Sequence, residues 1–96
     1  MSNVIPPAAA THWCYDDVYQ TIVKYIHLDL NQTQYVLNFS VIALCITNPR
    51  AMVRFTLQSL NTNQCHQWET ILNGYNLEEL YNSVYTKVEA RKQYLH

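Results

Sequence analysis

Apolar residues recur at helical spacing near the N-terminal end of the chain. Thr11 precedes them as the predicted N-cap, and Asp16 and Asp17 lie in the first turns, where the helix dipole favours acidic side chains. The pattern predicts a helix over residues 12–28. Its apolar stripe follows offsets 0, 3, 4, 7 and 11 and comprises Tyr15, Val18, Tyr19, Ile22 and Ile26.

A second helical stripe lies near the C-terminal end. Asn76 is the predicted N-cap, and Glu79 three residues later completes a pattern like a capping box. Acidic residues begin this segment and basic residues end it, which matches the helix dipole. The pattern predicts a helix over residues 77–94. Its apolar positions are Leu77, Leu80, Tyr81, Val84, Tyr85 and Val88.

Between the two helices the apolar period changes to that of a strand. Residues 35–45 alternate and are rich in β-branched side chains, although a buried helix is an alternative for residues 41–46, which are apolar on every side. Residues 51–58 alternate more regularly. Because the turn dipeptide Asn48-Pro49 separates these segments, we predict a β-hairpin with a loop over residues 46–50.

The hydrophobic pattern also predicts the register of this hairpin. If Val41 faces Phe55, one face of the hairpin is wholly apolar. A slip by one residue would set Arg54 beside apolar side chains of the other strand. We therefore predict that Val41 pairs with Phe55.

Residues 65–73 fit two structures. Trp68 and Leu72 alternate as in a third strand, but the same segment also fits a short helix ended by Gly74. We favour the strand because a two-stranded hairpin is weak by itself. The sequence thus predicts an α+β fold of order α-β-β-(β)-α, with a small antiparallel sheet flanked by the two helices. Residues 12–96 form its single domain, after a flexible arm over residues 1–11.

Composition excludes several classes of protein. The chain has 96 residues, 49% of them hydrophobic, and a formal net charge of −1. This length allows one domain, and the apolar fraction is too high for a disordered chain. No segment has the pattern of a signal peptide, and the longest apolar run, residues 41–46, is too short to span a bilayer. Three cysteines are a poor disulfide framework, so we predict a cytoplasmic or nuclear protein with reduced thiols.

Cysteine and histidine supply only a weak candidate for a metal site. His12, Cys14, Cys65 and His66 are ligand types that tetrahedral zinc accepts, but their spacings differ from known ligand pairs. We therefore predict no metal and no cofactor. The chain has no glycine-rich phosphate loop and no GxSxG or HExxH motif, so we also predict no enzymatic activity.

The predicted element order is similar to that of double-stranded RNA-binding domains. Such a domain needs cations at the start of its last helix, where this chain has Glu78 and Glu79. The near-zero net charge also argues against nucleic acid. RNA binding is therefore the alternative hypothesis, with solvated surface charge as the competing interpretation. Its candidate contacts are Arg50, Arg54, Lys87, Arg91 and Lys92.

The second face of the predicted sheet carries more apolar residues than a solvated face needs. Two helices cover one face of a three-stranded sheet, so apolar surface should remain for a partner unless the N-terminal arm folds over it. We therefore predict a small interaction module of the viral or regulatory accessory type, which binds a protein partner or forms a homodimer. The predicted interface residues are Ile42, Leu44, Ile46, Met52 and Leu60.

Overall fold

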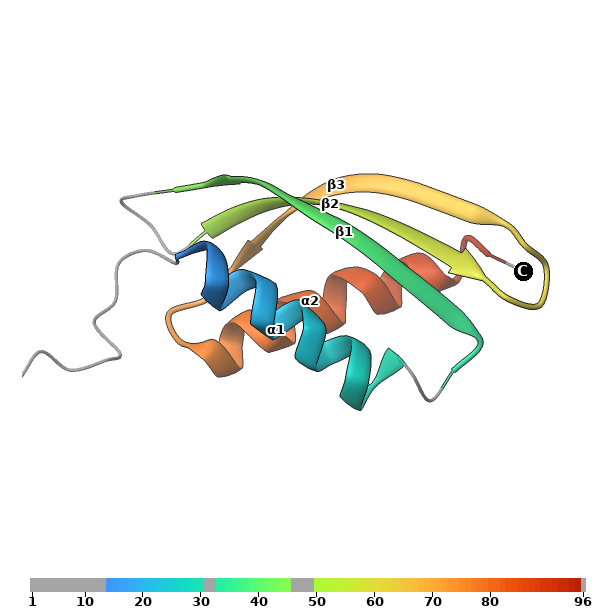
Figure 1. Ribbon diagram of the computed structural model, residues 1–96, viewed down its shortest axis with the longest axis horizontal. Coiled ribbons are helices and arrows are strands. Elements are labelled where there is room, and N and C mark those ends of the chain that lie inside the picture. The colour runs from blue at the N-terminus through green and yellow to red at the C-terminus, as the bar shows by residue number, and fades with distance from the viewer. Residues whose placement is uncertain (1–13, 31–32, 46–49, 96) are drawn as a thin grey trace, which may run out of the picture.

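The computed structural model describes residues 14–30, 33–45 and 50–95. Its element order confirms the predicted α+β fold and shows residues 65–73 as a strand. The predicted arm over residues 1–11 and most of the predicted loop over residues 46–50 lie outside the described residues. The elements are α1 (Tyr15–Leu28), β1 (Tyr35–Leu44), β2 (Arg50–Ser59), β3 (Cys65–Asn73) and α2 (Leu77–Lys92) (Figure 1).

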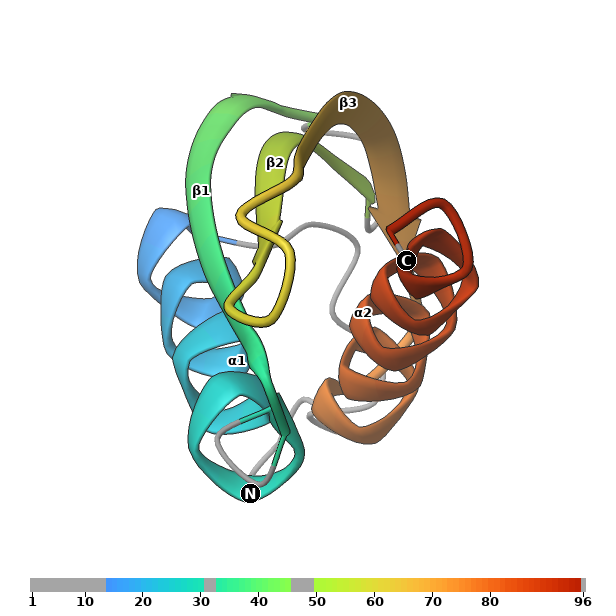
Figure 2. The ribbon, with the colours of Figure 1, turned by 90° about the vertical axis from the view of Figure 1, so that its right-hand side faces the viewer.

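The three strands form one antiparallel sheet with β2 at its centre. Both helices lie side by side against the same face of this sheet (Figures 1 and 2). They run in the same direction, so both N-termini lie at the end of the sheet where β2 begins (Figure 1). No helix or strand of the described residues covers the opposite face, which we call the outer face.

The hydrophobic core lies between the helices and the inner face of the sheet. Strand β2 alternates strictly along its first half, with Val53 and Phe55 fully buried and Arg54 between them exposed. Most of the two predicted helical stripes supplies the other side of the core, as amphipathic helices do when they cover a sheet. Tyr25, outside the predicted stripe, is also buried, whereas four stripe positions are exposed: Tyr15, Tyr19, Leu77 and Tyr85. The fully buried side chains from the helices are Val18, Ile22, Tyr25, Leu80, Val84 and Val88.

Tyrosines join the two helices. The Tyr25 ring of α1 packs edge-on against Tyr81 and Tyr85 of α2, with ring centroids 6.2 and 6.1 Å apart. Its hydroxyl donates a hydrogen bond to Glu89 Oε2 at 2.9 Å, and the Tyr81 hydroxyl donates to Asp29 just after α1. Burial, then the bond to Glu89, raises the pKa of Tyr25, and burial with the bond to Asp29 raises the pKa of Tyr81 to about 12. Both phenols therefore stay protonated donors at neutral pH.

The predicted hairpin register is wrong by two residues. Val41 pairs with Val53, and Phe55 pairs with Phe39. Because side chains alternate with a period of two, a shift of two residues leaves the same side chains on the same face, and the hydrophobic pattern cannot distinguish the two registers. A β-bulge between Val41 and Ala43 then shifts the phase of β1 near its end.

The start of each helix is held by side-chain hydrogen bonds. Helix α1 begins at Tyr15 with Cys14 as N-cap, and the Asp17 carboxylate accepts from the Cys14 N–H at 3.2 Å. The predicted N-cap, Thr11, is therefore wrong, and the helix begins three residues later than predicted. In α2, Asn76 Oδ1 accepts from the Glu79 N–H at 2.9 Å, which confirms the predicted cap. This helix ends at Lys92, two residues before the predicted boundary.

Candidate functional site

Three of the five predicted RNA-binding cations contact other side chains of the fold. Arg54 forms an exposed ion pair with Glu69 across β2 and β3, with Nη2 and Oε2 2.6 Å apart. Arg91 contacts His66 Nε2 at 2.9 Å and lies over the rings of Trp68 and Tyr94. Lys92 pairs with Glu89 one turn earlier at 2.9 Å and lies over Tyr35. The side chains of these three cations therefore already have partners within the fold.

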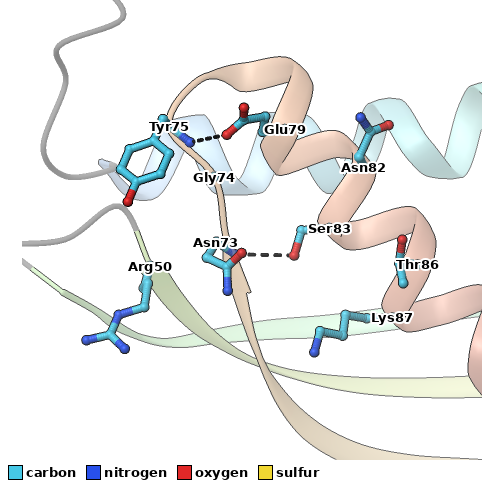
Figure 3. A pocket seen from close by; sticks show the side chains of 9 residues that line it. All are labelled: Arg50, Asn73, Gly74, Tyr75, Glu79, Asn82, Ser83, Thr86 and Lys87. Carbon is cyan, nitrogen blue, oxygen red and sulfur yellow. Dashed lines mark hydrogen bonds between the residues drawn. The ribbon is translucent and has the colours of Figure 1, made fainter.

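The other two cations, Arg50 and Lys87, line one pocket. Arg50 is the exposed first residue of β2, and Lys87 lies on the polar side of α2. The pocket has a volume of about 640 Å³ and lies where the end of β3 turns into α2 (Figure 3). We call it the corner pocket. Its lining consists of Arg50, Asn73, Gly74, Tyr75, Glu79, Asn82, Ser83, Thr86 and Lys87.

Gly74 brings the end of β3 against the first turn of α2. It is buried, and a Cβ at this position would lie 2.7 Å from Leu80 N and 2.8 Å from Glu79 C. A side chain would therefore push the strand away from the helix. The approach is held on one side by the Asn73 N–H, which donates to Ser83 Oγ at 3.2 Å, and on the other by the Tyr75 N–H, which donates to Glu79 Oε1 at 2.8 Å (Figure 3).

Apart from Arg50 and Lys87, sequence reasoning missed the residues of this pocket. A signal was present, because five polar side chains of α2 follow helical offsets 0, 3, 4, 7 and 8: Glu79, Asn82, Ser83, Thr86 and Lys87. This polar stripe runs beside the apolar stripe, but the sequence did not show that Arg50 would lie next to it.

The outer face of the sheet carries an exposed apolar cluster at the end where β2 begins. It consists of Ile42, Met52 and Ile71, one from each strand, whose exposed fractions are 43%, 37% and 41%. Met52 pairs with Ile71 of β3 and with Ala43 of β1, and Ile42 is the bulge residue just before Ala43. We call these residues the outer-face cluster. A shallow apolar hollow of about 240 Å³ adjoins it, lined in part by Met52 and Ile71.

The remaining predicted interface residues do not belong to this cluster. Leu44 packs against the core, contrary to the prediction, because the bulge before it turns it toward the inner face opposite buried Ala51. Leu60 is exposed but lies in the turn after β2. Ile46 lies outside the described residues. The prediction omitted Ile71, which belongs to the cluster because it pairs with Met52 across β2 and β3.

A groove of about 750 Å³ between the solvent sides of the helices is acidic. One lysine, Lys24, lines it together with four carboxylates and the exposed side chains of Leu28 and Leu77. The carboxylates occupy the first turns of both helices and the end of α1. They are Asp16, Asp17, Asp29 and Glu78. Glu78 lies at the start of the last helix, where a duplex RNA-binding domain would need cations.

The residues of the weak metal candidate do not meet. Cys14 lies at the start of α1, whereas Cys65 and His66 begin β3 at the opposite end of the sheet (Figure 1). His12 lies outside the described residues. Among residues 14–30, 33–45 and 50–95 no group of three or more His, Cys, Asp or Glu side chains is arranged to hold a metal ion, and no disulfide is present.

The described helices are too short or too polar to cross a membrane. Comparison of the chain with known protein families, with curated proteins and with solved structures finds no match.

Proposed function

We propose that this protein is a non-enzymatic interaction module that self-associates through the outer face of its sheet. The observation that carries the proposal is the outer-face cluster, because it exposes one large apolar side chain from each strand. Met52 pairs with Ile71, and Ile42 directly precedes the β1 partner of Met52. A contiguous apolar patch ringed by polar residues is the usual pattern of a protein interface. Ser40, Arg54 and Glu69 form the polar row next to the cluster.

A second copy of the chain fits this surface by charge. The Arg54–Glu69 pair presents one positive and one negative group beside the cluster, so a two-fold arrangement can set each arginine near the glutamate of the other copy. The net charge of −1 adds little repulsion between copies.

The exposed fractions limit the strength of this association. Complete burial of an Ile or Met side chain contributes about 1.5–3 kcal/mol. Burial of the parts of the three cluster side chains that are now exposed would therefore contribute about 2–3.6 kcal/mol per copy and about 4–7 kcal/mol per pair to association. Association itself costs at least about 4 kcal/mol. We therefore expect a weak dimer that forms as the concentration rises.

Sedimentation equilibrium from about 10 µM to about 1 mM tests this expectation. The wild type should change from monomer toward dimer, and Ile42→Lys should shift the midpoint to about tenfold higher concentration or more, because both copies lose apolar burial and must desolvate an ammonium group. Val36→Lys is the matched control, since Val36 is an aliphatic side chain of the same strand and face with 39% exposure, outside the cluster.

Circular dichroism checks that both variants are folded, and Ile71→Lys replaces Ile42→Lys if the bulge does not tolerate lysine. A wild type that stays monomeric across the range would refute self-association. Equal effects of lysine at positions 36 and 42 would refute the role of the cluster.

RNA binding is the weaker proposal. The observed element order matches the one that suggested it, and Arg50 and Lys87 share a pocket. However, Arg54, Arg91 and Lys92 contact neighbouring side chains, and the first turn of α2 carries Glu78 and Glu79. Duplex RNA that bound at low salt, and lost affinity in Lys87→Gln, would favour it over the first proposal.

A further inference from the structure

The corner pocket contains the two basic side chains that have no partner among the described residues. Arg54 and Lys92 form ion pairs, Arg91 contacts His66, and Lys24 lies over the Tyr81 ring. Arg50 and Lys87 have no ion pair or side-chain hydrogen bond within the described part of the chain, yet they come from different elements and line the same cavity. Figure 3 shows them on opposite sides of Asn73.

The rest of the lining supplies hydrogen-bond donors. Ser83 Oγ accepts the Asn73 N–H, so its own hydrogen remains available to a ligand. The Thr86 hydroxyl lies one turn further along the same side of α2, and the Asn82 amide is next to Ser83. Two cations with hydroxyl and amide donors around them suit an anion that accepts several hydrogen bonds at once.

Glu79 is the one acidic residue of the lining. Its Oε1 already accepts the Tyr75 N–H at 2.8 Å, which binds it to the backbone at the rim. With Arg50 and Lys87 the formal charge of the lining is +1, in a chain whose total is −1. The pocket is therefore more positive than the molecule as a whole.

We propose that the corner pocket binds a small phosphate ester that carries an aromatic ring, such as a mononucleotide. The phosphate group lies between Arg50 and Lys87 and accepts from the Ser83 and Thr86 hydroxyls. The Tyr75 ring, 68% exposed at the rim, stacks on the ring of the ligand. The volume of about 640 Å³ is that of a typical small-molecule site. This inference does not depend on self-association.

Titration of the full chain with AMP, followed by NMR of the backbone amides, tests the proposal. Signals of Ser83 and Thr86 should shift with AMP and, more weakly, with inorganic phosphate, but not with adenosine, which lacks the phosphate. Arg50→Gln and Lys87→Gln should each weaken AMP binding by about tenfold or more, because each removes a charged hydrogen bond. Tyr75→Ala should weaken AMP binding and leave inorganic phosphate binding unchanged.

Arg54→Gln is the matched control, because it removes one arginine charge from the same strand outside the pocket. It should bind AMP as the wild type does. Thr86→Val keeps the shape of its side chain and tests the site without loss of charge, with weaker binding expected. Ile42→Lys should retain AMP binding, which separates this result from the test of self-association.

The proposal is overturned if AMP at millimolar concentration shifts no pocket signal, or if Arg54→Gln weakens binding as much as Lys87→Gln does. It is also overturned if adenosine binds as well as AMP. A short single-stranded RNA that bound the same residues far more tightly than AMP would replace the small ligand with a polymer.

Discussion

Substitution of Gly74 by alanine should destabilise the fold through one local clash. The new Cβ would lie 2.7 Å from Leu80 N and 2.8 Å from the carbonyl carbon of Glu79, both of which are backbone atoms of α2. Ordinary contacts of a Cβ lie at 3.4–4 Å, so the strand or the helix must move by about 0.7 Å or more. A helix backbone held by its own hydrogen bonds yields less readily than a side chain.

The expected loss follows from two opposing terms. Overpacking of this kind costs about 1–3 kcal/mol, whereas replacing glycine stabilises by about 0.4–1 kcal/mol because the unfolded chain has less freedom. We expect a net loss of about 1–2 kcal/mol in the free energy of unfolding. For a chain of 96 residues this lowers the melting temperature by roughly 4–16 °C.

Urea unfolding followed by circular dichroism measures this difference. Asn73→Ala is the matched control, since it changes an exposed side chain at the adjacent position while the Asn73 N–H can still donate to Ser83. This variant should stay within about 0.5 kcal/mol of the wild type. If Gly74→Ala unfolds at the same urea concentration as the wild type, the close approach of β3 to α2 is not needed for stability.

Three further predictions have defined outcomes. The raised pKa values of Tyr25 and Tyr81 predict that the stability they contribute is complete below about pH 10 and falls above it, since the unfolded chain then releases protons that the folded chain retains. The free energy of unfolding should fall by up to about 1.4 kcal/mol per pH unit for each tyrosine. Tyr81→Phe should reduce this slope in urea titrations between pH 8 and 12, with exposed Tyr75→Phe as control. Asn63 has a φ of 60°, so Asn63→Gly should keep or raise the melting temperature while Asn63→Ala lowers it; equal values would refute the backbone argument. Phe55→Ala empties the centre of the core and should cost about 3–5 kcal/mol in urea unfolding; a loss below about 1 kcal/mol would show that the core collapses around the gap.

The element types were predictable because each amphipathic pattern repeats several times. The alternation of β2 appears in the structure as a buried face, and most positions of the two helical stripes are buried or packed against the core. Four stripe positions are exposed instead: Tyr15, Tyr19, Leu77 and Tyr85. The register was not predictable from the same information, since pairing Val41 with Phe55 or with Val53 buries the same side chains. The bulge before Leu44 was also invisible, because one extra residue in a run that is apolar on every side leaves no mark in the pattern.

The candidate sites depended on contacts between distant segments. Ile42 and Met52 were predicted on the outer face because both lie in the hairpin, but Ile71 joined them only once β3 was placed beside β2. Likewise, Arg50 and Lys87 are 37 positions apart in the sequence, and their place in one pocket depends on which side of α2 faces the end of the sheet. The charge pattern alone does not distinguish these two cations from those that contact other side chains of the fold.

Both helices cover the same face of the sheet, and this has a consequence for synthesis of the chain. Helix α1 and the three strands leave the ribosome before α2, so the inner face of the nascent sheet at first has half of its cover. Until Leu80, Val84 and Val88 emerge, Phe55 and Leu72 lack part of their packing. Chains stalled before α2 should therefore be held by chaperones or degraded, and the native core should close only at a late stage of translation.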